Sequence, residues 1–404
     1  MSELGEGASI STSKVDPDKY LKARVTNVRF EGIYRACREK KEINSKDWHW
    51  PAGKPDGYQK SKKAVVYQVK KGKTHTATVK VKIDSKGISG EGTLTGTLGK
   101  LVFEGKIPLD NKTHEVTVTL KEVPEHLNWT KGSMTWEINA GADAALAGAT
   151  RVELFFVFDD PASKKFFEPD GVWIEALRFI FKEARLEGTK EIKEGLGKVT
   201  QGCFKYPHHV YDIHEGANHF GGKTKIFSLA NYMKPVRGIV NCYDQAYAVI
   251  VFSGALGTTV NGLFQLHFGY LKMTQLVGRG ACNNPFPEDK FESVKKDSRS
   301  SDMIKLPTLE DYLVVDPSDI YRAAFINHMF CQFAGESVYD ACAGPATGEL
   351  NHEGYLKKNV DLVTPEPDYG HKYPKTEKDI EFNYTKKLFD IDMPGFDVGV
   401  HSVE

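Results

Sequence analysis

The first part of the chain alternates apolar and polar residues. In residues 76–83 every second side chain is apolar, and residues 114–120 repeat this pattern. Such alternation is typical of strands with one buried face. Glycine-rich segments such as 95–99 separate the runs as turns. We therefore predict that residues 20–163 form an antiparallel β-sandwich, with the dense apolar run 152–158 as its last strand.

The pattern becomes helical after Asp159. Asp170 suits a helix N-cap, and Gly188 marks the end of that helix. Its apolar stripe is formed by Trp173, Ala176, Leu177, Ile180, Phe181 and Ala184. We therefore expect a domain boundary between Asp159 and Asp170.

Two further segments complete the predicted organisation. Residues 164–404 are predicted to form an α+β domain with a C-terminal extension, which contains several prolines from Asn351 onward and wraps the surface. The polar residues 1–19 are predicted to be a flexible tail.

An apolar helix is predicted to begin at Cys242. Asn241 is a good N-cap residue, and Asp244 is an acid in the first turn. A cysteine at this end of a helix faces unpaired backbone N–H groups and the positive end of the helix dipole. Both favour the thiolate over the thiol. Cys242 is therefore a candidate nucleophile, and its own backbone N–H is a candidate oxyanion donor.

A β-hairpin downstream supplies candidate partners for this thiol. Residues 325–333 read as one strand and residues 338–342 as the return strand. His328 on the first strand is a candidate base, and Asp340 on the second is the group that would orient it. The two side chains share a face only if the loop has an odd number of residues, such as Ala334–Glu336, or if the hairpin contains a bulge.

The sequence Cys242-Tyr243-Asp244-Gln245-Ala246, followed by His328 and Asp340, resembles the transglutaminase-like branch of the papain-like cysteine enzymes. The resemblance covers roughly residues 170–350. The long gap between Cys242 and His328 implies an insertion. The resemblance implies a papain-like α+β domain and a Cys-His-Asp triad that transfers an acyl group through a thioester. The substrate would be a protein or peptide carboxamide, and the acceptor an amine (transglutaminase) or water (deamidase or protease). The chemistry needs no cofactor and no metal.

A non-catalytic function is the alternative. The β-sandwich could bind a protein or a carbohydrate, with the transglutaminase-like domain inactive. The aromatic residues Trp48, Trp50, Trp129 and Trp136 would form a binding face in that case, or the core of the sandwich otherwise. The remaining cysteines are expected to be structural, with Cys331 and Cys342 in the core and with Cys203 and Cys282 in loops.

Residues 208–224 contain two other candidate motifs. Residues 217–224 fit a loose phosphate-binding loop, but no buried strand precedes them, so a plain loop is favoured. Four histidines lie nearby as candidate zinc ligands: His208, His209, His214 and His219. His214 and His219 are five positions apart, a spacing that would not direct both at one metal from a helix.

Composition limits the binding partners and the cellular location that we expect for this protein. The chain of 404 residues carries 54 basic and 54 acidic residues, so no overall charge points to nucleic acid or to an anionic membrane. The longest apolar run, near 246–256, is too short to span a bilayer. Six cysteines without regular spacing, and no secretion signal, favour a reduced cytoplasmic location. The sequence does not indicate an oligomeric state.

Overall fold

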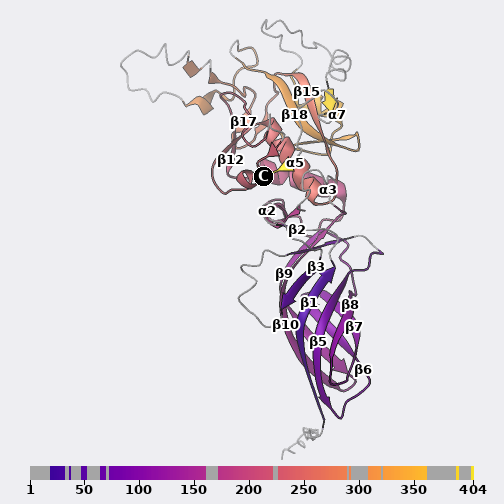
Figure 1. Ribbon diagram of the computed structural model, residues 1–404. Coiled ribbons are helices and arrows are strands. Elements are labelled where there is room, and N and C mark those ends of the chain that lie inside the picture. Colours follow the sequence, from indigo (N-terminus) through magenta and orange to yellow (C-terminus); the bar gives the residue numbers. More distant parts are fainter. Residues whose placement is uncertain are drawn as a thin grey trace, which may run out of the picture.

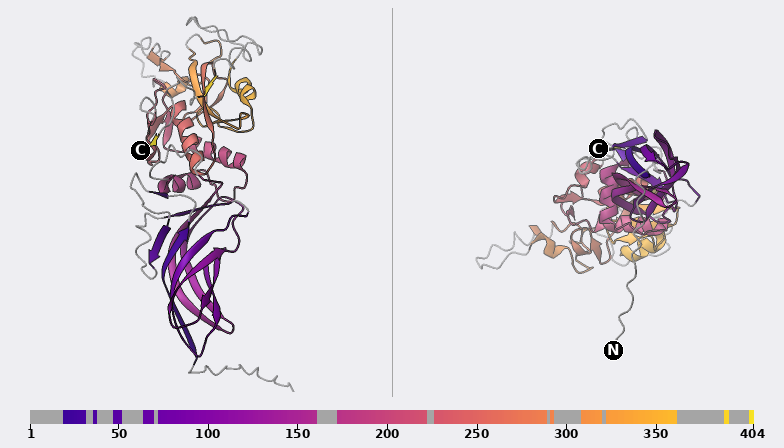
Figure 2. Two further views of the ribbon diagram at one scale, coloured as in Figure 1. Left: turned by 45° about the vertical axis from the view of Figure 1, so that its right-hand side comes forward. Right: turned by 90° about the horizontal axis from the view of Figure 1, so that it is seen from below.

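The computed structural model describes residues 19–31, 36–37, 47–51, 64–69, 72–160, 172–221, 226–288, 291–292, 308–319, 322–361, 388–390 and 402–404. Strands dominate the N-terminal part, and helices with smaller sheets form the C-terminal part. The two parts are stacked end to end (Figure 1) and give the molecule an elongated outline in a second view (Figure 2). The predicted tail of residues 1–19 lies almost wholly outside the described residues.

The N-terminal part is built from long strands. Their bounds are β1 Tyr20–Glu31, β2 Ala36–Cys37, β3 Asp47–Pro51, β4 Val65–Gln68, β5 Thr76–Lys86, β6 Glu91–Leu98, β7 Leu101–Pro108, β8 Thr113–Leu120, β9 Asn128–Ala140 and β10 Asp143–Val157. All except β2 join one nine-stranded sheet in the order β3-β1-β5-β8-β7-β6-β9-β10-β4. Its pairs are antiparallel, apart from β4, which runs parallel to β10.

This sheet corrects the predicted sandwich. The described strands form one continuous sheet, which curls until β1 packs beside β10, instead of two separate sheets. Bulges between Val25 and Asn27 in β1 and between Leu146 and Gly148 in β10 increase the local twist and help the sheet to close. Alternation identifies the buried face of a strand, but it does not specify how many sheets share that face.

The interior of the curled sheet is the core of the N-terminal part. The alternate apolar residues of β5 are buried as predicted: Ala77, Val79, Val81 and Ile83. Trp136 is also fully buried, and its indole N–H donates to Thr150 Oγ1 at 3.1 Å. Trp136 is therefore a core residue, whereas the side chains of Trp48 and Trp50 lie outside the described part of the structure.

The C-terminal part mixes short strands with helices. Its elements are β11 Val172–Trp173, α2 Ile174–Glu183, α3 Ile192–Phe204, β12 His209–Tyr211, β13 Ile226–Phe227, α4 Leu229–Tyr232, β14 Gly238–Val240, α5 Cys242–Ala255, β15 Asn261–Gly269, β16 Thr274–Leu276, β17 Gly280–Cys282, the 3₁₀ helix η2 Leu309–Tyr312, β18 Phe325–Phe333, β19 Ser337–Asp340, β20 Ala346–Thr347, α7 His352–Asn359, β21 Leu388–Asp390 and β22 Ser402–Val403. The whole chain is thus a mixed, strand-rich α+β structure. Among its described residues, no helix is both long and apolar enough to cross a bilayer.

One sheet and one helix carry the candidate site. The sheet has the order β20-β19-β18-β15-β21, and α5 packs against β18 (Figure 1). Helix α5 is apolar on every side, and all but one of its residues are buried. A helix of this kind must be surrounded by protein, and here α2 and α3 cover it together with the sheet.

The two parts of the chain share a junction with both polar and apolar contacts. Glu153 of β10 is buried, accepts a hydrogen bond from Trp129 Nε1 at 2.9 Å, and forms an ion pair with Arg178 of α2. Phe155 stacks on Trp129, with ring centroids 5.6 Å apart, and belongs to the same apolar cluster as α2 and α5. Trp129 therefore supports the junction.

Candidate active site

Cys242 is the first residue of α5, as predicted. The Asn241 side chain accepts from the Asp244 backbone N–H at 3.1 Å, and Asp244 Oδ2 accepts from the Asn241 backbone N–H at 3.2 Å. This reciprocal capping box fixes the first turn of the helix. Cys242 is only 4% exposed. The sequence therefore places the sulfur at the end of a buried helix whose start is held on both sides.

Asp244 also binds the backbone of a second segment, residues 219–221. Its carboxylate accepts backbone N–H bonds from His219, Phe220 and Gly221 at 2.8–2.9 Å. Gly221 passes so close to Tyr247 of α5 that an added Cβ would lie 2.4 Å from its ring. Burial raises the pKa of Asp244 to about 6, although these hydrogen bonds oppose the rise. One side chain thus joins the helix start to a distant loop.

The same contacts decide against the phosphate-binding loop. Residues 222–225 lie outside the described residues, but the amides of 219–221 already donate to a carboxylate. These amides are therefore not free to converge on a phosphate.

His328 and Asp340 meet across the hairpin of β18 and β19. The register pairs Cys331 with Tyr339 and Phe333 with Ser337, which leaves a loop of three residues, Ala334–Glu336. Ala334 and Gly335 both have positive φ values, 53° and 73°. The condition for a shared face, a loop with an odd number of residues, is therefore met. His328 Nε2 lies 2.9 Å from Asp340 Oδ2, so the N–H donates to the carboxylate.

Asp340 is held by more than the histidine. Its carboxylate accepts from the backbone N–H of Cys342 at 2.7 Å and of Ala343 at 3.2 Å, and from the hydroxyl of Tyr355 at 2.5 Å. Tyr355 belongs to α7, in the segment after Asn351 that was predicted only to wrap the surface. Asn351 in fact caps α7, with its side chain accepting from Gly354 N. That cap was a usable sequence signal, whereas the contact with Asp340 was not visible in the sequence.

The remaining nitrogen of His328, Nδ1, is buried and makes no hydrogen bond with the described residues. The Cys242 thiol at the start of α5 acts on the same imidazole and raises its pKa. Nδ1 is therefore the ring nitrogen that Asp340 leaves unoccupied.

Electrostatics distinguish His328 from a nearby histidine. Burial lowers the pKa of His328, but the charge of Asp340, its hydrogen bond and the Cys242 thiol outweigh burial and raise that pKa to about 10. His352 in α7 is only partly buried and lacks such a carboxylate, and its loss of solvent lowers its pKa to about 4. Asp340 therefore favours an imidazolium beside Cys242 at neutral pH.

Aromatic side chains cover the imidazole. Phe325 stacks on His328 with ring centroids 5.1 Å apart and nearly parallel rings, and Phe268 lies at 4.6 Å. Phe286 packs edge-on against Phe325 at 5.7 Å. Phe286 lies in a segment of which residues 289–290 and 293–307 are outside the described part of the structure. The apolar cover excludes water from the ring and strengthens its interaction with Asp340.

The other described cysteines are structural. Cys331 and Cys342 are buried in the core as predicted, and burial raises the pKa of each thiol. Cys203 and Cys282 were predicted to lie in loops, but Cys203 lies in α3 and Cys282 ends β17. Burial raises the pKa of both thiols to about 12, which makes them poor nucleophiles at neutral pH.

The histidine-rich segment does not assemble a metal site. Across the part of the chain that the structure describes, no three His, Cys, Asp or Glu side chains come together as ligands. His219 instead pairs with Asp212 at 3.3 Å, and His209 is buried among aromatic rings such as that of Tyr232.

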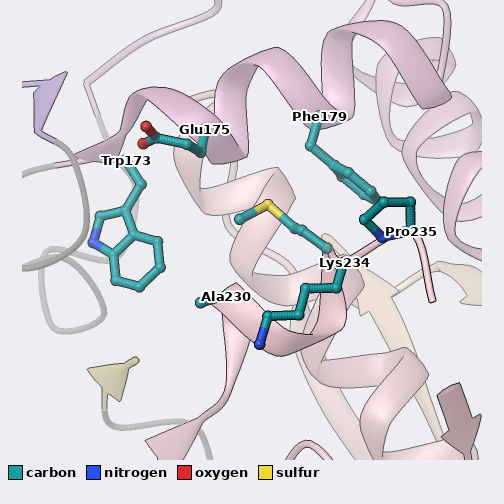
Figure 3. A pocket seen from close by; sticks show the side chains of 7 residues that line it. Trp173, Glu175, Phe179, Ala230, Lys234 and Pro235 are labelled. Carbon is teal, nitrogen blue, oxygen red and sulfur yellow. The ribbon is translucent and has the colours of Figure 1, made fainter. Parts of the chain in front are cut away.

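A separate pocket opens beside α2, with a volume of about 260 Å³. Trp173, Met233 and Lys234 line it, and Figure 3 shows Lys234 reaching across the opening below Phe179. None of the three candidate catalytic residues lines this pocket.

The sequence matches no protein-family model, and no curated protein matches it. Among solved structures, the chain is similar to red sea bream transglutaminase, with a TM-score of 0.38 and 11% identity. The superposition covers 81% of this chain and 56% of that chain, so this chain corresponds to little more than half of that protein. A likeness of this degree does not establish a family or an activity.

Proposed function

We propose that this protein is a cysteine-dependent acyltransferase or hydrolase of the transglutaminase-like kind, with Cys242 as nucleophile, His328 as acid and base, and Asp340 as the group that orients His328. One observation carries the proposal. The Asp340 carboxylate binds His328 Nε2 at 2.9 Å, which leaves Nδ1 for a cysteine at a helix N-terminus. This is the arrangement that nucleophilic catalysis requires.

The proposed reaction begins from a Cys242 thiolate paired with the protonated His328 imidazolium. The thiolate attacks the carbonyl carbon of a protein or peptide carboxamide, and the backbone N–H of Cys242 stabilises the developing oxyanion. The S–C bond remains as the C–N bond breaks, and the imidazolium gives its proton to the leaving amine.

The thioester is then transferred to an acceptor. An amine or a water molecule attacks the carbonyl carbon and gives its proton to His328, and the sulfur leaves as thiolate. An amine acceptor gives a cross-link, and water gives deamidation or proteolysis. The same three residues serve each outcome, so the acceptor is a matter for experiment.

Selective alkylation tests the nucleophile. Native protein is treated with limiting iodoacetamide at pH 6, where an ordinary thiol with a pKa of about 8.5 is almost wholly protonated. Mass spectrometry of the digest is expected to show modification at Cys242 first. Cys203 and Cys282 serve as internal controls, because burial raises the pKa of both thiols to about 12.

Two histidine variants make this test specific. His328→Gln is expected to abolish the preference for Cys242 at pH 6, whereas His352→Gln, a change at a partly buried histidine of α7, is expected to retain it. Equal labelling of Cys242 in all three proteins would contradict the proposed pair. Comparison of a lysate incubated with wild-type protein or with Cys242→Ala, by untargeted mass spectrometry, would then identify deamidated, cross-linked or cleaved substrates.

A further inference from the structure

Tyr355 forms a hydrogen bond with Asp340 of the proposed triad. Its hydroxyl donates to Asp340 Oδ2 at 2.5 Å, and the same oxygen accepts from His328 Nε2 at 2.9 Å. Tyr355 is fully buried. Burial, together with the Asp340 charge, raises the pKa of the phenol well above its ordinary value, so the hydroxyl remains a donor throughout the working pH range.

The surroundings of Tyr355 fix the position of this donor. Its ring contacts Phe330 at 5.1 Å and Phe268 at 6.1 Å between centroids. Helix α7 is tied to the chain after β15, because Lys272 N donates to Asn359 O at 2.7 Å. The hydroxyl is therefore placed by a helix, by packed rings and by a neighbouring segment, with little freedom to leave the carboxylate.

We infer that Tyr355 is a positioning residue for the proposed acyl transfer, which holds Asp340 so that Oδ2 faces His328 and Nδ1 is left for Cys242. The inference rests on the proposed function. Asp340 and Cys242 are the ionisable groups that act on His328, and the charge of Asp340 also acts on the Cys331 and Cys342 thiols and on Tyr355 of α7. Tyr355 also draws negative charge from Oδ2, which weakens the hold of Asp340 on the imidazole proton.

A matched pair of variants tests this role. Tyr355→Phe removes the hydroxyl that binds Asp340 and keeps the ring. Tyr339→Phe removes a hydroxyl from the buried residue next to Asp340 in β19, and within the described structure that hydroxyl has no hydrogen-bond partner. Both changes therefore delete one buried oxygen close to the site, but only one deletes a donor to the carboxylate.

The readout is the NMR signal of the His328 Nε2 proton in protein with ¹⁵N-labelled histidine. In Tyr355→Phe this signal is expected to move downfield, because Oδ2 has lost one of its three donors and binds the His328 N–H more strongly. In Tyr339→Phe it is expected to keep its wild-type position. No movement in Tyr355→Phe, or an equal movement in both variants, would overturn the inference.

A measurement on the wild-type protein guards against a variant that does not fold. The Tyr355 hydroxyl proton is expected as a slowly exchanging downfield signal with a nuclear Overhauser contact to the His328 Nε2 proton. Its absence would also overturn the inference. Failure of the proposed function has a different signature, namely Cys242 alkylation at pH 6 that does not depend on His328.

Discussion

Replacement of Asp340 by asparagine is the most informative single change in this protein. Asp340 Oδ2 accepts from His328, Tyr355 and Ala343, and Oδ1 accepts from Cys342 N. Each oxygen of the carboxylate thus faces at least one donor. An amide NH₂ group in either position would face a donor instead of an acceptor, so Asp340→Asn loses hydrogen bonds as well as the charge.

The size of the effect follows from the electrostatics of His328. The pKa of this imidazole lies at about 10, against an ordinary value of 6.5. Without Asp340, the largest effects that raise this pKa are removed, and burial lowers it. A fall of the pKa from about 10 to the ordinary value of 6.5 corresponds to about 5 kcal/mol of lost imidazolium stabilisation. At pH 6 the Cys242 thiol would lack its charged partner, and we expect its alkylation rate to fall by more than about 100-fold.

The assay is the rate of iodoacetamide reaction at Cys242, measured at pH 6 and pH 9. A large loss at pH 6 and a small loss at pH 9 are expected, because an ordinary thiol ionises by pH 9. Asp110→Asn is the control, since it alters a second Asp–His pair, with His114, in the distant N-terminal part. A rate at pH 6 within tenfold of wild type in Asp340→Asn would refute this account of the site.

Three further outcomes are expected. The raised pKa of His328 contributes stability that is complete below pH 6.5 and is lost as the pH rises through about 10. In urea titrations, the difference in unfolding free energy between wild type and His328→Gln should therefore shrink from pH 6.5 to pH 10. A difference that stays constant over this range would contradict the prediction. Arg178→Ala should lower the free energy of unfolding by about 2 kcal/mol, because it leaves the buried Glu153 with Trp129 alone, although Arg178 itself is 36% exposed. Lys182→Ala, at a lysine that is 76% exposed, should change it little, and equal effects of the two variants would refute the difference. A fragment of residues 19–160 should melt cooperatively in circular dichroism, because a complete apolar cluster lies within it; a featureless melt would show that it depends on the C-terminal part.

The local features of the site could be predicted from the sequence because each depends on neighbouring residues. The start of α5 follows from the capping pair Asn241 and Asp244, and the hairpin follows from one loop between two apolar runs, whereas its register was left open by the sequence. Tyr355 was missed because it meets Asp340 only through the packing of α7 against a sheet formed by earlier residues. A contact of this kind leaves no periodic signal in a single sequence.

Helix α3 shows a second limit of sequence reasoning. It contains Gly195, Gly197 and Gly202, which disfavour a helix, and no helix was predicted there. The structure explains them as close approaches. A Cβ at Gly197 would lie 3.0 Å from the Thr347 carbonyl oxygen, and one at Gly202 would lie 3.0 Å from the Cα of Ala184. Tertiary packing here overrides helix propensity.

The carboxylate of Asp244 has a consequence for how this sequence can evolve. It caps α5 and also holds the backbone of residues 219–221, while the ring of Tyr247 leaves no room for a side chain at Gly221. A mutation at any one of these positions removes a contact that constrains the residues at the others. We therefore expect Gly221, Asp244 and Tyr247 to covary among homologues, to be retained or replaced as a set, and to drift independently only in descendants that have abandoned the nucleophile.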